Sequence, residues 1–399
     1  MALVNIRSCG RRGFHPGLCA YATRTVGVPR KREQQDETPV FQYVGQHRKP
    51  RGKVFVWGFS YTGALGIPSF VVPDSGRKKP RKYQLTPYRL DTEQKISSAA
   101  CGYGFTLLAC NSRDLTKLWG MGLNKDSQLG FQRTQHDRHK SYDYVLEASP
   151  VSLPLVNPQE TRVLQVSCGR AHSLVLTDSE GVFSMGNNAY GQCGRKIVED
   201  EVYSGSHGVH KIEGFDSGVK QVACGQDHSL FLTDRGSVYA CGWGADGQTG
   251  LFHHLCVIIS VSFLSDSLFV PLFATRHFPK KCIQTTLEEG EVFVWGFGIL
   301  GKGPKLSESA IPERVPATLF GRSEFNPTVK VSSIRCGLNH FAAITDRGEL
   351  FVWGKNVRGC LGIGKHDDQY FPWRVTVPGH VTDVACGVDH MVALVKSII

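Results

Sequence analysis

The sequence predicts an all-β protein in which short hairpin units wrap into a closed propeller. Two phrases recur along the 399 residues, they keep a fixed distance from one another, and the first and last copies are two halves of one unit. Hydrophobic residues make up 41% and charged residues 20%, which is typical of a globular chain, and the 44 glycines indicate many tight turns.

The first phrase is Cys-Gly-x-x-His followed by a short apolar run. A variant at Cys101 has phenylalanine in place of the histidine. Short apolar runs after a glycine are typical of strands that leave a turn. The four complete copies begin at Cys168, Cys224, Cys336 and Cys386, and their histidines are His172, His228, His340 and His390.

The second phrase is an apolar strand that ends in Trp-Gly, with a further glycine eight residues later. Trp57-Gly58 and Trp353-Gly354 have this form, and Trp295-Gly296 keeps the Trp-Gly pair. Met121-Gly122, Met185-Gly186 and Cys241-Gly242 keep the eight-residue offset with another residue before the glycine.

The spacing of the two phrases predicts hairpins. The spacing is counted from the cysteine of the first phrase to the residue before the glycine of the second phrase, for example from Cys168 to Met185. It is 17 positions in three units and 20 positions in the unit of Cys101. Turn sequences such as Thr233-Asp234-Arg235-Gly236 lie between the two apolar runs. Because the Trp-Gly-type glycines recur every 54 to 64 residues, the chain predicts a propeller or a solenoid.

The chain ends favour the propeller. Trp57 has no Cys-Gly phrase before it, and Cys386 has no Trp-Gly phrase after it. Joining the two ends would complete one unit and remove an exposed sheet edge. We therefore expect the N-terminal and C-terminal strands to pair and close the ring.

The two phrases together resemble the regulator of chromosome condensation repeat. The resemblance covers about residues 50–396 and, with the N-terminal leader described below, is closest to a mitochondrial member of that family. It implies a propeller of nominally seven blades, whereas only six Trp-Gly-type phrases are present.

The fifth unit is degraded, and an irregular segment at 251–288 precedes it. Cys282 stands 13 rather than 17 residues before Trp295, and residues 255–274 match neither phrase. This 20-residue stretch contains Asp266 and Pro271, which argue against a membrane-spanning helix. An improvised strand pair or insert, a spanning helix, and an alternative exon or faulty gene model all stay open. A ring short of one blade would leave an open edge.

The N-terminus carries most of the net charge of +11. Residues 1–50 hold nine Lys and Arg but three Asp and Glu, and no acid precedes Glu33. An arginine-rich, acid-free start is typical of a mitochondrial transit peptide. We expect residues 1–45 to be that leader and a disordered linker, with the protein in the mitochondrial matrix or at the inner membrane; a basic arm that touches RNA or lipid is the alternative.

No residue pattern predicts catalysis, a metal or a cofactor. On one extended strand, the Cys and His of a phrase would stand roughly 13 Å apart, too far to share a metal ion. We expect the repeated histidines to hydrogen-bond backbone groups between blades. Gly296 to Lys302 mimics a phosphate-binding loop, but Gly303 and Pro304 follow in place of a hydroxyl residue and a helix.

One basic run is a candidate contact for RNA or a protein partner, although a solvated loop would explain it equally. It lies in the long connection after the first Trp-Gly phrase. A weaker group lies at 133–140, and neither set shows interleaved aromatic residues that would stack on bases. The run consists of Arg77, Lys78, Lys79, Arg81 and Lys82.

The resemblance also implies a function. It implies a guanine nucleotide exchange factor, without chemistry of its own, for a dynamin-related GTPase of the inner mitochondrial membrane that drives fusion, with peripheral association at that membrane. It further implies a role in mitochondrial ribosome biogenesis. The alternative is a scaffold that binds mitochondrial rRNA or ribosome assembly proteins without affecting nucleotide release. Neither reading fixes an oligomeric state.

Overall fold

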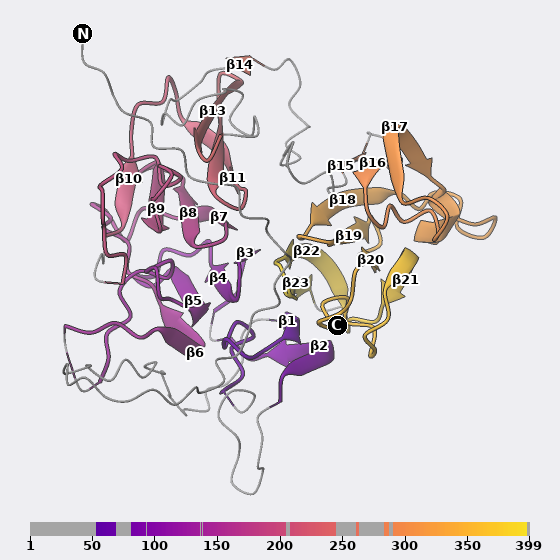
Figure 1. Cartoon of the computed structure of the whole chain (residues 1–399), viewed down its shortest axis with the longest axis horizontal. Coiled ribbons are helices and arrows are strands. Elements are labelled where there is room, and N and C mark those ends of the chain that lie inside the picture. Colours follow the sequence, from indigo (N-terminus) through magenta and orange to yellow (C-terminus); the bar gives the residue numbers. More distant parts are fainter. Residues whose placement is uncertain are drawn as a thin grey trace, which may run out of the picture. The chain divides into compact units, whose positions relative to one another are not determined.

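The fold is built almost wholly from antiparallel strands. The computed structural model describes residues 53–68, 81–92, 94–135, 137, 139–204, 208–244, 261–262, 283–286 and 290–396. Within these ranges the helical element is a short 3-10 turn, η2 (Ala317–Phe320). The predicted all-β propeller class is confirmed (Figure 1).

Six sheets follow one another along the described chain, five with four strands and one with three. The first three lie between residues 98 and 262. They are β3 (Ser98–Cys101), β4 (Phe105–Ala109), β5 (Leu118–Leu123) and β6 (Tyr144–Pro150); β7 (Val163–Cys168), β8 (His172–Thr177), β9 (Val182–Gly186) and β10 (His210–Ile212); and β11 (Val219–Cys224), β12 (His228–Thr233), β13 (Ser237–Gly242) and β14 (Val261–Ser262).

The next two sheets belong to the C-terminal half of the chain. The fifth unit, whose first phrase is degraded, forms the three-stranded sheet. These sheets are β15 (Ile283–Thr286), β16 (Val292–Phe297) and β17 (Glu308–Val315); and β18 (Val331–Cys336), β19 (His340–Thr345), β20 (Leu350–Gly354) and β21 (Gln369–Val375).

The sixth sheet joins the two ends of the chain. Its strands are β1 (Val54–Phe59), β2 (Tyr83–Leu90), β22 (His380–Cys386) and β23 (His390–Lys396), in the order β2-β1-β23-β22. Trp57 pairs with Met391 in an antiparallel register. The predicted pairing of N-terminal and C-terminal strands is therefore confirmed, and it covers a strand edge that would otherwise be open.

The hydrophobic core lies between sheets rather than within any one of them. Five buried clusters each fill the junction of two sheets that pack together; one, for example, joins Phe105 of β4 to Val175 of β8. The first and second strands of each sheet pack against the neighbouring sheets, as β4 does against β7. Because every blade buries its faces only against its neighbours, no single repeat is a stable unit.

Burial falls from the inner to the outer strands. The second strands β4, β8 and β19 are buried along their whole length, whereas β2, β17 and β21 are largely exposed. These three outer strands contain Pro87, Pro312 and Pro372. Because proline cannot donate a ladder hydrogen bond, it protects an exposed edge against pairing with another chain.

The glycine of the Trp-Gly phrase sits at a β-bulge. Gly58 has φ +112, and the β1–β2 register shifts between Val56 and Gly58. A Cβ at Gly58 would lie 2.6 Å from the His390 Cα. Both the left-handed backbone and the close approach of β23 therefore require glycine.

Two predicted regions fall mainly outside the described residues. The 1–45 leader lies outside them entirely, and so does Cys282. Of the segment at 251–288, the structure describes only the backbone of β14, which pairs with β13, and of β15, which pairs with β16. In the part of the chain that is described, no helix is long and apolar enough to cross a bilayer.

Candidate partner-binding face

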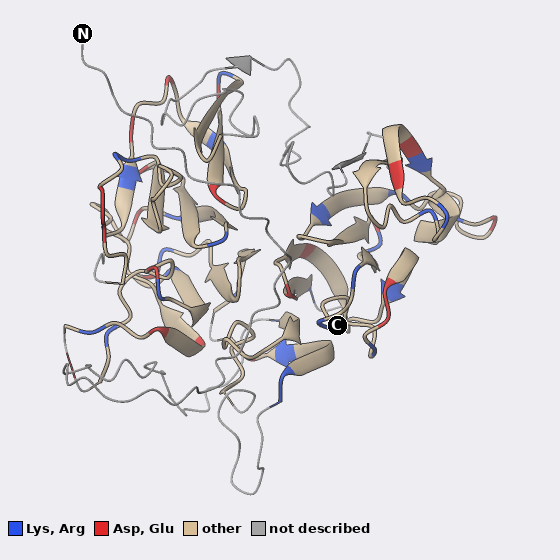
Figure 2. Ribbon diagram, viewed as in Figure 1, with Lys and Arg blue, Asp and Glu red and all other residues tan. Residues whose placement is uncertain are grey.

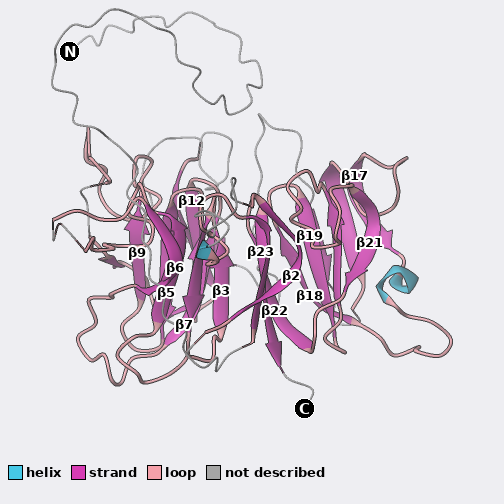
Figure 3. Cartoon of the chain, turned by 90° about the horizontal axis from the view of Figure 1, so that it is seen from below, coloured by secondary structure: helices cyan, strands magenta, loops and turns pink. Residues whose placement is uncertain are grey.

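The Cys-Gly-x-x-His phrases gather at one end of the strands, which we call the turn face. Each phrase is the turn between the first and second strand of its sheet, as at Cys168 to His172 between β7 and β8. The long connection between the third and fourth strands returns to the same end, because successive strands are antiparallel. Figure 3 shows strands running between two sets of connections.

The prediction of one extended strand through Cys and His is wrong. In every copy the glycine N–H bonds to the carbonyl of the residue three positions later, as from Gly169 to His172 at 2.9 Å. The phrase is therefore a tight turn, and cysteine and histidine lie on different strands. The turns of neighbouring sheets meet, since a Cβ on Gly387 would lie 3.0 Å from the Gly102 carbonyl oxygen.

Two of the four histidines bond across a sheet junction to a hydroxyl group. His390 Nε2 lies 2.7 Å from Thr106 Oγ1, and His172 Nε2 lies 3.0 Å from Ser229 Oγ. The hydroxyls donate in turn to the backbone carbonyls of Ala64 and Gln192. Through these hydroxyls each of the two rings is linked to a backbone carbonyl.

The hydroxyl bonds fix the state of these two rings. When Thr106 and Ser229 donate to these carbonyls, the neutral ring donates from Nε2 and its Nδ1 is unprotonated. Burial lowers the pKa of His172 and of His390 to about 3, and that of His340 to about 4. The rings are neutral at physiological pH and act as structural donors, not as acids or bases.

His340, His228 and the Trp-Gly tryptophans are also placed in the structure. His340 Nδ1 lies 3.5 Å from Cys360 Sγ, and the equivalent of Thr106 in the next sheet is Met391, which has no hydroxyl. His228 begins β12 and is buried. Trp57 and Trp353 are fully buried, whereas Trp295 in β16 is only partly buried.

The repeated thiols offer no nucleophile or metal site within the described part of the chain. Burial raises the pKa of Cys193, Cys224 and Cys336 to about 12, so the reactive thiolate is disfavoured. Among the residues that the structure describes, no group of three His, Cys, Asp or Glu side chains could hold a metal ion. Lys302, at the end of the phosphate-loop mimic, is paired with Glu313 at 2.7 Å.

Charged and polar side chains link adjacent turns. Arg170 Nε lies 2.9 Å from Asp227 Oδ1, and Gln226 Nε2 bonds the Tyr103 hydroxyl. Burial raises the pKa of the Tyr103 phenol, and the Asp227 carboxylate adds to this effect. These contacts hold the turns of three successive sheets in one fixed arrangement.

Of the predicted basic run, Arg77, Lys78 and Lys79 lie outside the described residues. Arg81 and Lys82 are described and exposed. Their backbone carbonyls accept bonds from Ser60, from its hydroxyl at 3.1 Å and from its N–H at 2.9 Å. The exposed Arg133, His139 and Lys140 of the weaker group lie in the β5–β6 connection, which also returns to the turn face.

Next to the basic run, the structure assembles a row of four aromatic rings that the sequence did not predict. We call it the aromatic row: Tyr61, Phe59, Tyr83 and His366. Ring centroids are 6.2 Å apart for Tyr61 and Phe59, 5.5 Å for Phe59 and Tyr83, and 4.9 Å for Tyr83 and His366. The Arg358 guanidinium lies 4.6 Å from the centre of the Phe59 ring. The one signal in the sequence was Tyr83, directly after Lys82.

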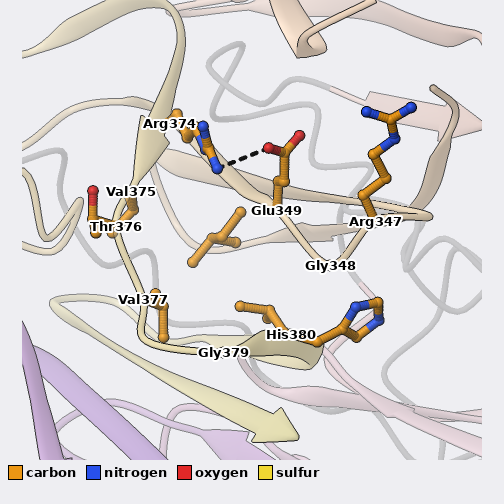
Figure 4. Close-up of a pocket in the computed structure, with 11 residues that line it drawn as sticks. Arg347, Gly348, Glu349, Arg374, Val375, Thr376, Val377, Gly379 and His380 are labelled. Carbon is orange, nitrogen blue, oxygen red and sulfur yellow. Dashed lines mark ion pairs between the residues drawn. The ribbon is translucent and has the colours of Figure 1, made fainter. Parts of the chain in front are cut away.

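A pocket of about 430 Å³ lies at the opposite end of the strands, between the sheets of β20–β21 and β22 (Figure 4). Its lining includes Arg347, Glu349, Arg374 and His380. Arg374 is paired with Glu349 at 2.8 Å, and Arg347 bonds Asn326. Arg374 is therefore neutralised by a carboxylate of the same lining, whereas Arg347 donates to an amide oxygen and has no ion pair among the described residues.

Charge is mixed over the described chain, with Lys and Arg beside Asp and Glu on all parts of the fold (Figure 2). The turn face nevertheless combines exposed cations, rings and rigid turns, and its described residues include no catalytic group. Such a surface can bind a macromolecule.

The fold and this face define a β-propeller binding protein built from hairpin repeats. The family model of the Regulator of chromosome condensation (RCC1) repeat matches residues 51–109, 117–176, 179–232 and 347–394, and a second RCC1 repeat family model matches 163–192, 219–248 and 331–360. The chain belongs to the RCC1 repeat family.

Two curated relatives extend the similarity to the whole chain. The human RCC1-like G exchanging factor-like protein is 56% identical over 461 aligned positions, which cover 100% of this chain and 99% of the human protein. The mouse protein of the same name is also 56% identical, over 92% of each chain.

Solved structures of two proteins have a similar fold. The crystal structure of human WBSCR16 has a TM-score of 0.76 and 58% identity, and it covers 86% of this chain and 100% of its own. Prp20p from Saccharomyces cerevisiae, whose structure was reported with its binding to Gsp1p and histones, has a TM-score of 0.52 and 17% identity, covering 87% of this chain and 92% of its own, which supports the fold alone.

The alignment with the human protein also bears on the blade count. It runs over 461 positions and this chain has 399 residues, so at least 62 positions face a gap. Nearly all of both chains is covered, so the gap is mainly internal. Summed over the alignment, these positions amount to about one repeat of 54 to 64 residues.

Proposed function

We propose that this chain is a guanine nucleotide exchange factor that acts on a GTPase through its turn face. The observation that carries the proposal is the 56% identity, along the whole chain, with the RCC1-like G exchanging factor-like protein. An exchange factor needs no chemistry of its own, because it binds the nucleotide-free GTPase more tightly than the loaded form. A rigid face whose described residues include no catalytic group fits this role.

We further propose a dynamin-related GTPase of the inner mitochondrial membrane as the target, with a role in membrane fusion. The support is the family resemblance and the arginine-rich, acid-free start of the chain, which is typical of mitochondrial import. Imaging of the full chain and of a chain without residues 1–45 tests the location. Loss of mitochondrial signal on truncation supports it, and an unchanged distribution contradicts it.

Release of labelled GDP tests the exchange activity directly. The full-length protein, added in substoichiometric amounts, should accelerate release from the candidate GTPase. Arg170→Glu and Arg358→Glu, on the turn face, should each lower the rate about tenfold by placing repulsive charge in the contact. Arg374→Glu, at the opposite end of the strands, is the matched control and should keep the wild-type rate. No acceleration by the wild-type protein would remove the proposal.

A second candidate function is assembly of mitochondrial ribosomes through rRNA or ribosome assembly proteins. The exposed Arg81 and Lys82, at the end of the basic run, favour it. The variant with Ala at Arg77, Lys78, Lys79, Arg81 and Lys82 should crosslink less RNA and show a shallower salt dependence. Unchanged crosslinking would exclude this run as the RNA contact.

A further inference from the structure

We propose that the aromatic row is a stacking site for the unpaired bases of single-stranded RNA, with Arg81 and Lys82 holding the adjoining phosphates. This inference rests on the second candidate function and deepens it, because it names the form of RNA and the residues that would bind its bases. It depends on side chains that three separate segments bring together: 59–61, 81–83 and 366.

The exposure of the row suits stacking. Tyr61 is 42% exposed and Tyr83 is 39% exposed, and His366 is also exposed. Large aromatic side chains in a folded chain are normally covered, so neighbouring exposed rings indicate a contact surface. Every nucleobase has a flat face that stacks on such rings whatever its identity.

Charge around the row favours a polyanion. Lys82 directly precedes Tyr83, and both it and Arg81 are exposed. Two of the nearby carboxylates are paired, Asp389 with Arg358 at 3.3 Å and Asp367 with Lys365 at 3.0 Å, and Asp368 accepts the Asn356 N–H. A cationic strip beside aromatic rings is the combination that binds single strands.

The row is also held rigidly, which limits the entropy lost on binding. The Phe59 N–H bonds to the Asp389 carbonyl oxygen at 2.8 Å. The Arg358 guanidinium covers the Phe59 ring, and Ser60 fixes the backbone of Arg81 and Lys82. Duplex RNA cannot use the rings, because its bases are stacked and paired within the helix.

The test measures binding of the full-length protein to a fluorescent single-stranded RNA of about 12 nucleotides across a salt series. The double variant Tyr61→Ala/Tyr83→Ala should weaken binding about tenfold or more without changing the slope of log K against log salt. Arg81→Ala/Lys82→Ala should instead lower the slope by about 0.7 for each phosphate that the variant no longer neutralises. Tyr83→Phe keeps the ring and should bind like the wild type.

Tyr88→Ala is the matched control, because Tyr88 is 43% exposed on the same strand but lies toward its other end. It should bind RNA normally, and urea unfolding should show equal stability for the variants compared. A duplex of the same length should bind more weakly and respond only to the basic substitutions.

The outcomes separate the two ideas. If the wild-type protein binds no RNA, the rRNA form of the second candidate function fails and the stacking site fails with it. If RNA binds but the tyrosine variants bind equally well, only the stacking site is wrong. If those variants lose GDP release while RNA binding is unchanged, the row is a protein contact and the inference is overturned.

Discussion

Trp57 and Trp353 occupy equivalent positions in neighbouring sheets, yet only one of them has a hydrogen-bond partner among the described residues. Both are fully buried. Trp57 Nε1 donates to the Cys360 carbonyl at 2.8 Å. Cys360 lies in the connection between β20 and β21 of the preceding sheet. Trp353 Nε1 has no acceptor in the described part of the chain. A buried donor without a partner costs about 1–3 kcal/mol.

The difference originates in the preceding repeat. In the connection that contacts Trp57, Gly362 follows Gly354 by eight positions. In the connection that contacts Trp353, Gly301 follows Gly296 by only five positions. The shorter connection still reaches the indole, since a Cβ on Gly301 would lie 2.8 Å from Trp353 Nε1. It presents no carbonyl there. The shorter connection in one repeat thus leaves the buried tryptophan of the next repeat without a hydrogen-bond acceptor among the described residues.

The largest loss of stability should come from acidification. It tests whether the buried histidines of the different sheets are all neutral in the folded protein. The folded pKa values of His172, His340 and His390 lie below the unfolded value of about 6.5, so folding excludes protons and stability falls as the pH drops below 6.5. Between pH 7 and 5 we expect a loss of about 2 kcal/mol per histidine, measured by urea unfolding.

His390→Phe is the control for this prediction, because Phe105 occupies the same repeat position naturally. The variant should lose about 2 kcal/mol less on acidification than the wild type. An equal loss would mean that His390 does not contribute, and that its junction differs from that of His172.

A smaller effect should come from breaking the closing sheet. Gly58→Ala forces a left-handed backbone on alanine and a clash with His390, and we expect a loss of about 3 kcal/mol or more in the free energy of unfolding. Gly181→Ala is the matched control, because Gly181 has φ +82 but the Cβ would meet only Lys211 at 3.8 Å. It should cost about 1–2 kcal/mol. Equal losses would show that the close approach at Gly58 is unimportant.

The smallest effect compares the two tryptophans directly. Trp57→Phe removes a buried hydrogen bond, whereas Trp353→Phe removes none to the described residues, while both lose similar volume. We expect Trp57→Phe to cost about 1 kcal/mol more, measured by urea unfolding under identical conditions. A larger loss at Trp353 would contradict the role given to the preceding connection.

Much of the fold could be predicted because its signals are local. The turn at Asp234, the apolar runs on either side and the unmatched phrases at Trp57 and Cys386 are all readable in the chain. The turn in the Cys-Gly phrase also has a local signal. Glycine at the second position of the phrase is typical of a turn, so it marks the end of the first strand.

The candidate site could be predicted only in part. The basic run is contiguous, so it was visible, whereas His366 lies far along the chain from Tyr83 and nothing in the sequence links the two. The two hydroxyls that bond a histidine, Thr106 and Ser229, directly follow Phe105 and His228 in the repeat and were therefore readable in the chain. Their partners in the neighbouring sheets were not.

The sequence by itself determined the repeat and its period, because hydrogen bonding within a hairpin depends on neighbours in the chain. It also indicated the closure of the first strand on the last, because the unmatched phrases at Trp57 and Cys386 are two halves of one unit. Only the tertiary structure decided which ring nitrogen donates to which hydroxyl, which tryptophan finds an acceptor among the described residues and which rings form a row. Those contacts join residues of different sheets, and their geometry depends on how sheets pack rather than on any local pattern.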